Sequence, residues 1–197
     1  EQMLEMHRIY GEVLLEQKIA KKIFDNVISN RNFSLHGMKI YTRAVDIFNG
    51  DMILTGRHPN GDIYVFFADL AGHGLTAAIA VLPVSEMFFN MLEKSENVEN
   101  ILEKINNTLI EILPTGMFMA CCILKIDINN KILFLWNAGM PDIYILDSHL
   151  ENVARHIESS SIPLGIAELD RSDIQFEKLR FHSGHQLYML SDGLTDI

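Results

Sequence analysis

Three aspartates stand at the ends of apolar stretches, where a carboxylate could do chemistry. Asp51 opens the stretch DMILTG, Asp69 follows the run IYVFFA, and Asp192 follows HQLYMLS. No lysine or arginine lies within three residues of Asp69 or Asp192. An ionised carboxylate is costly to place in apolar surroundings unless it is paired, protonated or bound to a metal. If the three meet in one pocket, a divalent cation would offset their mutual repulsion.

The residue types favour a hard cation, Mg²⁺ or Mn²⁺, because these ions prefer oxygen ligands. Two such ions about 3.5–4 Å apart can share a water molecule and lower its pKa enough to supply hydroxide. Glycines near each aspartate (Gly50, Gly72 and Gly193) allow the backbone to come close. For any single aspartate, an ordinary helix cap or glycine turn is the alternative explanation. The three together favour the metal site.

Five short motifs follow one another along the chain. They are Asn49-Gly50-Asp51, Asp69-Leu70-Ala71-Gly72-His73-Gly74, Asn137-Ala138-Gly139, Pro163-Leu164-Gly165 and Ser191-Asp192-Gly193-Leu194-Thr195-Asp196. This series resembles the PPM (type-2C) metal-dependent protein serine/threonine phosphatases, and most of all their bacterial SpoIIE/RsbU branch. The resemblance covers about residues 37–197.

The resemblance implies an α+β fold, an αββα sandwich of two mostly antiparallel sheets with outer helices, holding two Mn²⁺ or Mg²⁺ ions. By motif match, Asp51, Asp69 and Asp192 become metal ligands, together with the main-chain carbonyl of Leu70. A water between the ions would attack the phosphorus of a phosphoserine or phosphothreonine. His73 would contact a ligand carboxylate, a metal-bound water or the leaving oxygen, or else cap the next helix. A direct bond from His73 to the metal is disfavoured because imidazole suits softer ions.

Domains of this branch often follow receiver, PAS or GAF modules, and they dephosphorylate an anti-sigma-factor antagonist. The resemblance therefore implies a phosphorylated protein partner in bacterial signalling. Leu54 and Met140 depart from the family pattern, which often has an acidic residue and a histidine there. The family's last metal aspartate lies further along than Asp192 and is not among the residues up to Ile197. Either the sequence is truncated or that segment is absent, and without this ligand we expect weaker metal binding. These departures leave a second function open, a degenerate phosphatase fold that binds a partner protein without catalysis. A third is an unrelated Mg²⁺ hydrolase of a small phosphate ester.

The amino-acid composition limits which classes of protein this chain can belong to. The 197 residues are 48% hydrophobic and 21% charged, which is typical of a globular domain. The net charge of −10 argues against nucleic-acid binding, which needs a basic face. No apolar run approaches 18 residues, so no membrane insertion is expected. The only cysteines, Cys121 and Cys122, are adjacent and would point to opposite faces of a strand, so we expect no disulfide and a cytoplasmic location.

A long helix is expected at the start of the chain, with residues 1–30 as a linker and residues 31–197 as the phosphatase domain. Its heptad seam consists of Met3, Met6, Tyr10, Val13, Gln17, Ala20, Phe24 and Val27. This spacing of three and four predicts one of two arrangements. The helix either lies along the domain as an amphipathic helix or forms a parallel coiled coil that joins two copies into a homodimer.

The remaining elements must position the aspartates. Patterns predict strands at 38–48, 51–58 and 62–70, with a turn at 59–62 that makes the last two a hairpin. Helices are expected at 75–93 and 98–112, with Pro83 able to kink or delay the first. A three-stranded meander over 117–147, a polar loop over 148–161 and strands near 174–181 and 186–191 complete the expectation.

Overall fold

The computed structural model describes residues 2–41, 50–71, 75–147 and 153–194. The elements in chain order are α1 (Gln2–Ser29), β1 (Asp51–Arg57), β2 (Ile63–Leu70), α2 (Leu75–Glu93), α3 (Val98–Ile112), β3 (Met119–Asp127), β4 (Ile132–Ala138), β5 (Ile143–Leu146), β6 (Val153–Ile157), β7 (Glu177–Arg180) and β8 (Gln186–Tyr188). Two short 3₁₀ helices, η1 (Arg171–Asp173) and η2 (Asp192–Leu194), flank the last strands. Within these residues, no helix is both long and apolar enough to cross a bilayer.

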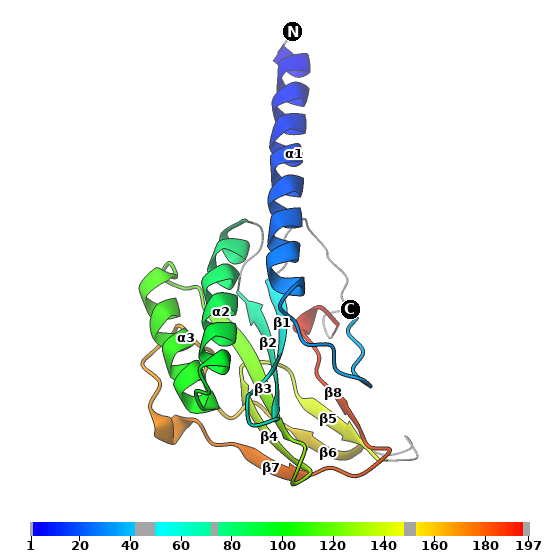
Figure 1. Cartoon of the computed structure of the whole chain (residues 1–197). Coiled ribbons are helices and arrows are strands. Elements are labelled where there is room, and N and C mark those ends of the chain that lie inside the picture. The colour runs from blue at the N-terminus through cyan, green and yellow to red at the C-terminus, as the bar shows by residue number, and fades with distance from the viewer. Residues whose placement is uncertain (1, 42–49, 72–74, 148–152, 195–197) are drawn as a thin grey trace.

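The strands form two antiparallel sheets (Figure 1). The first has the order β1-β2-β3-β4-β7, and the second has the order β6-β5-β8. The hairpin of β1 and β2 is closed by the expected turn, where the side chain of Asn60 accepts a hydrogen bond from the Asp62 amide at 2.9 Å. Gly61 adopts a φ of 98°, which favours glycine. The α+β class, the two antiparallel sheets and the N-terminal helix are confirmed.

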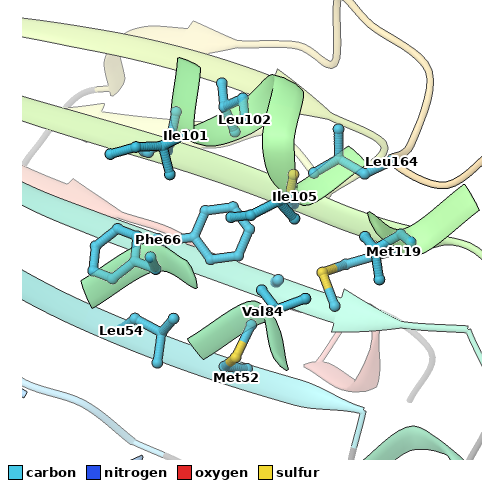
Figure 2. Close-up of a cluster of buried hydrophobic side chains, with 14 of the residues drawn as sticks. Met52, Leu54, Phe66, Val84, Ile101, Leu102, Ile105, Met119 and Leu164 are labelled. Atoms are coloured by element: carbon cyan, nitrogen blue, oxygen red, sulfur yellow. The ribbon is translucent and has the colours of Figure 1, made fainter. Parts of the chain in front are cut away.

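Two apolar clusters hold the domain together. In the first, α2 and α3 cover one face of the five-stranded sheet, and Figure 2 shows Leu54 and Phe66 from the strands near Val84 and Ile105 from the helices. The second cluster lies between the two sheets. Its members include Val65, Phe67, Cys122, Leu124, Leu133, Leu135, Ile143, Ile145 and Ile157. Alternate residues of β2 therefore serve different clusters, which explains why this strand is apolar almost throughout.

Helix α1 projects away from the domain (Figure 1), so the arrangement in which it lies along the domain is wrong. The seam residues of its N-terminal half, Met3, Met6, Tyr10 and Val13, are open to solvent, with Met3 70% exposed and Tyr10 69% exposed. Helix α1 contacts α2, and the residues just after the helix add side-chain contacts with the domain. Arg31 forms ion pairs with Glu86 and Glu93 of α2.

Several elements differ from expectation. The expected strand at 38–48 has no regular structure at 38–41, and 42–48 lies outside the described residues. The polar stretch thought to be a loop contains β6, whose side chains are mostly exposed and therefore carry little apolar periodicity. The expected meander is divided, because β3 and β4 belong to one sheet and β5 to the other. Helix α2 continues through Pro83 over 19 residues.

Candidate metal centre

Asp51 and Asp69 lie side by side because of the register of the first hairpin. The two residues are directly paired across β1 and β2. Residues opposite each other in an antiparallel pair have Cβ atoms about 4.5–5.5 Å apart and point to the same face. Val65 and Phe67 belong to the cluster between the sheets, so alternation along β2 directs Asp69 into the same space. Both carboxylates therefore face the gap between the sheets.

Asp192 reaches this gap from the other sheet. It follows β8 by four residues and begins η2. Its carboxyl lies within hydrogen-bonding distance of the Asp69 carboxyl. The neighbouring Ser191 hydroxyl donates to Oδ2 of Asp51 at 3.3 Å. The structure thus brings all three sequence-predicted aspartates together, although Asp192 is 123 residues from Asp69 along the chain.

The three carboxylates of the cluster lie close enough to repel one another. Burial raises the pKa of Asp69 to about 7, and the charges of Asp51 and Asp192 and the hydrogen bond with Asp192 add to this effect. Burial also raises the pKa of Asp51, the hydrogen bond from Ser191 partly offsets the rise, and the charge of Asp192 adds to it. A proton or a cation must therefore offset the repulsion between these carboxylates.

Two observations on the described residues fit a cation rather than a proton alone. Oδ1 of Asp51 is buried and has no hydrogen-bond partner there, which is costly for a carboxylate oxygen. Gly50 lets the backbone before Asp51 come close to β2, since a Cβ at this position would lie 2.4 Å from the Leu70 carbonyl oxygen and 2.7 Å from Oδ1 of Asp69. The Leu70 carbonyl and the Asp69 carboxylate thus converge beside Asp51. Such an all-oxygen donor set suits Mg²⁺ or Mn²⁺.

His73 lies outside the described residues, so its catalytic role stays a prediction. The Ser191 hydroxyl restrains the carboxylate of Asp51, a contact that the sequence motifs do not predict. The only available signal was the position of Ser191, immediately before Asp192 in that motif.

The third and fourth motifs build the scaffold beside the cluster. The side chain of Asn137 is buried, and its amide nitrogen donates to the carbonyls of Met140 and Pro141 at 3.2 and 3.1 Å. These bonds hold the turn that carries the chain from β4 to β5. Gly139 has a φ of 85°, and a Cβ there would lie 2.6 Å from Cγ of Pro163. The two motifs therefore pack against each other.

Two sheets, helices on the outer face of the larger one, and an oxygen-rich site between them at one end define a domain of the PP2C phosphatase class. The sequence model of the family described as Stage II sporulation protein E (SpoIIE) matches residues 59–197. This match covers more than half of the chain, and the chain belongs to the SpoIIE family. No curated protein matches the sequence significantly.

Solved structures show the same fold. The SiaA-PP2C domain of Pseudomonas aeruginosa is 17% identical, and the match covers 94% of this chain and 74% of that chain with a TM-score of 0.77. The PP2C domain of SpoIIE from Bacillus subtilis is 17% identical over 75% of this chain, with a TM-score of 0.60. This chain spans only 41% of that structure. RsbX in complex with magnesium is 17% identical, and the match covers 82% of this chain and 71% of that chain with a TM-score of 0.57.

Proposed function

We propose that this domain is a metal-dependent phosphoserine/phosphothreonine protein phosphatase in a bacterial signalling protein. The observation that carries the proposal is the meeting of Asp51, Asp69 and Asp192 with a buried, unpartnered oxygen on Asp51. Two Mg²⁺ or Mn²⁺ ions bound there would supply Lewis acidity and an activated water for attack on phosphorus. The RsbX structure, which contains magnesium, supports this choice of ion.

In this proposal the residues of the chain hold the metal ions and orient the ligands. The three carboxylates and the Leu70 carbonyl hold the cations, and the Ser191 hydroxyl orients Asp51. Gly50 lets the backbone before Asp51 approach the Leu70 carbonyl and the Asp69 carboxylate closely. His73 is the candidate for orienting the leaving oxygen or supplying its proton.

A cysteine nucleophile is disfavoured by the same structure. Cys121 and Cys122 are both fully buried in β3. Burial raises the pKa of the Cys121 thiol well above its ordinary value and that of Cys122 to about 12. Because a thiolate is the reactive form, neither cysteine suits covalent catalysis. Both thiols are free.

The proposed substrate is a phosphorylated protein, and family membership supports an anti-sigma-factor antagonist as its class. The proposal is tested with p-nitrophenyl phosphate and a phosphoserine peptide, with Mn²⁺ varied from zero to millimolar. We expect Asp69→Asn to lose at least 100-fold in kcat/KM, since it removes a charged ligand. Asp127→Asn is the control, because Asp127 lies at the opposite end of β3 from the residue paired with Asp69. Equal activity in the wild type and Asp69→Asn would refute the assignment.

The non-catalytic adaptor remains the alternative, and two observations favour it. Leu54 is fully buried in the cluster under the helices, and Met140 is 3% exposed in the cluster between the sheets. Neither position can therefore supply the polar group that the family often places there. Absence of Mn²⁺-dependent hydrolysis in a chain that still binds Mn²⁺ would favour the adaptor.

We further propose that α1 pairs with α1 of a second copy as a parallel coiled coil. The seam residues Met3, Met6, Tyr10 and Val13 are exposed on a helix whose N-terminal part projects away from the domain. A second helix burying this stripe would supply the apolar contacts that a single copy lacks. An upstream input domain could then act on the phosphatase through this helix.

The residues after α1 join it to the elements that flank the aspartates. The guanidinium of Arg31 lies 2.7 Å from Oε2 of Glu86 and 3.0 Å from Oε1 of Glu93, both on α2. The Asn32 side chain donates to the Ile53 carbonyl at 3.0 Å and accepts from the Thr55 amide at 2.8 Å, both on β1. Movement of α1 would therefore act on α2 and β1 together, and β1 begins with Asp51.

Charged substitutions test the coiled coil. We expect Val13→Glu with Ala20→Glu to convert a dimer into a monomer in sedimentation velocity, because both positions lie in the seam. Leu15→Glu with Ile19→Glu is the matched control, since both side chains are exposed but lie off the seam. A wild-type chain that is monomeric at 100 μM, or equal loss of dimer in both variants, would contradict the proposal.

A further inference from the structure

A cavity lies between the two sheets, at the end opposite to the aspartates. This cavity has a volume of about 190 Å³. Its lining includes Leu124 of β3, Leu133 of β4 and Leu179 of β7 from one sheet, and Ile145 of β5 and Leu187 of β8 from the other. These aliphatic residues belong to, or pack against, the cluster between the sheets. The cavity is therefore a gap in the apolar interior that reaches the surface.

The cavity is well separated from the candidate metal centre. Ala120 of β3 is paired with Asp69, and Leu124 lies four residues further along the same strand. At about 3.3 Å per residue, this places the near wall of the cavity about 13 Å from the aspartates. The chemistry proposed for the metal centre gives this cavity no role.

The polar part of the lining is basic. It includes Arg180, His182 and His185, and the described residues of the lining include no aspartate or glutamate. This is notable in a chain with 26 acidic and 16 basic residues. The rings of His182 and His185 lie 5.3 Å apart across a turn in which the His185 amide donates to the His182 carbonyl. Arg180 forms no ion pair with any residue that the structure describes. The apolar hollow is thus bordered by groups that can attract an anion.

We propose that this cavity binds a small amphiphilic carboxylate, with its apolar tail between the sheets and its carboxylate beside Arg180, His182 and His185. The size sets the length of the tail. A dry cavity of about 150 Å³ in another protein admits benzene, so 190 Å³ has room for about six to eight carbon atoms. The basic groups of the lining, with no acidic residue among its described members, favour an anionic head group over a cationic one.

Titration calorimetry of the full chain with butanoate, hexanoate and octanoate tests the proposal. The titrations contain EDTA, so that binding of metal at the aspartates contributes no heat. Each added methylene should tighten binding about fourfold until the cavity is filled, because its transfer from water is worth that factor. Saturable binding that strengthens from butanoate to octanoate supports the proposal. No saturable binding up to 5 mM, or affinity independent of tail length, overturns it.

Two kinds of variant locate the binding. Arg180→Gln should weaken octanoate about tenfold and leave neutral 1-octanol unchanged, since it removes the fixed positive charge. Lys178→Gln is the matched control, because Lys178 is an exposed residue of the same strand outside the lining. Leu187→Trp should abolish binding of both probes by filling the cavity. If Leu187→Trp fails to fold by circular dichroism, Leu179→Phe replaces it. Equal weakening by Arg180→Gln and Lys178→Gln, or unchanged octanoate binding in a folded cavity-filling variant, overturns the assignment.

Discussion

The substitution Gly50→Ala tests how the candidate metal centre is built. An alanine Cβ at this position would lie 2.4 Å from the Leu70 carbonyl oxygen, 2.7 Å from Oδ1 of Asp69 and 3.1 Å from the Leu70 amide nitrogen. Real Cβ atoms essentially never approach other heavy atoms closer than 3.0 Å, so the first contact alone requires a shift of about 0.6 Å. Two of these three atoms belong to the backbone of β2, a strand paired on both sides, and cannot rotate away.

The shift must therefore move donor oxygens of the proposed site. A displacement approaching 1 Å at a site of this kind can cost about 100-fold in rate. Forcing an extra carbon into packed surroundings typically costs about 1–3 kcal/mol of folding stability. We expect Gly50→Ala to bind Mn²⁺ at least tenfold more weakly and to unfold at a lower temperature in EDTA. Calorimetric titration with Mn²⁺ and thermal unfolding measure the two effects.

Gly193→Ala is the matched control, because Gly193 also adjoins one of the three aspartates. None of the described atoms lies within 4 Å of the Cβ that this substitution would add. It should leave Mn²⁺ affinity within about twofold of the wild type. Wild-type Mn²⁺ affinity in Gly50→Ala, or an equal loss in both variants, would refute the argument that close approach at Gly50 shapes the site.

Two further predictions concern protons and the joint after α1. The pKa of Asp69 is about 7 in the folded chain and near 4 when unfolded, so the folded metal-free chain binds more protons between these pH values. Stability in EDTA should fall as pH rises from about 4 to about 7, and chemical denaturation across this range measures it. Mn²⁺ must displace this proton, so the affinity of the chain for Mn²⁺ should rise up to tenfold per pH unit towards pH 7 and then level off. A Mn²⁺ affinity that does not change from pH 5 to 7 would contradict the raised pKa. Arg31→Gln should leave the coiled coil intact in sedimentation, yet lower the melting temperature by loosening the contact with α2; an unchanged melting temperature would show that the two ion pairs contribute nothing.

The first hairpin could be predicted because its information is local. Asn60 and Gly61 mark the turn, and the strands on either side are apolar, so the turn sets the register that pairs Asp51 with Asp69. The motif series likewise indicated the class of fold, since the glycines and aspartates keep their order along the chain. The helix at 2–29 followed from its periodicity, but periodicity did not say whether the helix lies along the domain or projects from it.

Only the tertiary structure decided the remaining features. Strand β6 escaped prediction because an exposed edge strand needs no alternation of apolar residues. The chain passes from β4 in one sheet to β5 in the other through a turn held by hydrogen bonds from the buried side-chain amide of Asn137. In the sequence, this turn cannot be told from an ordinary turn within one sheet. Asp192 meets Asp51 and Asp69 because the two sheets pack face to face, and no local pattern encodes the distance between residues 123 positions apart. The sequence by itself determined which residues carry oxygen donors and which local turns hold them. Packing of one sheet on the other determined that those donors share one space, because burial of apolar faces fixes how separate strands are placed.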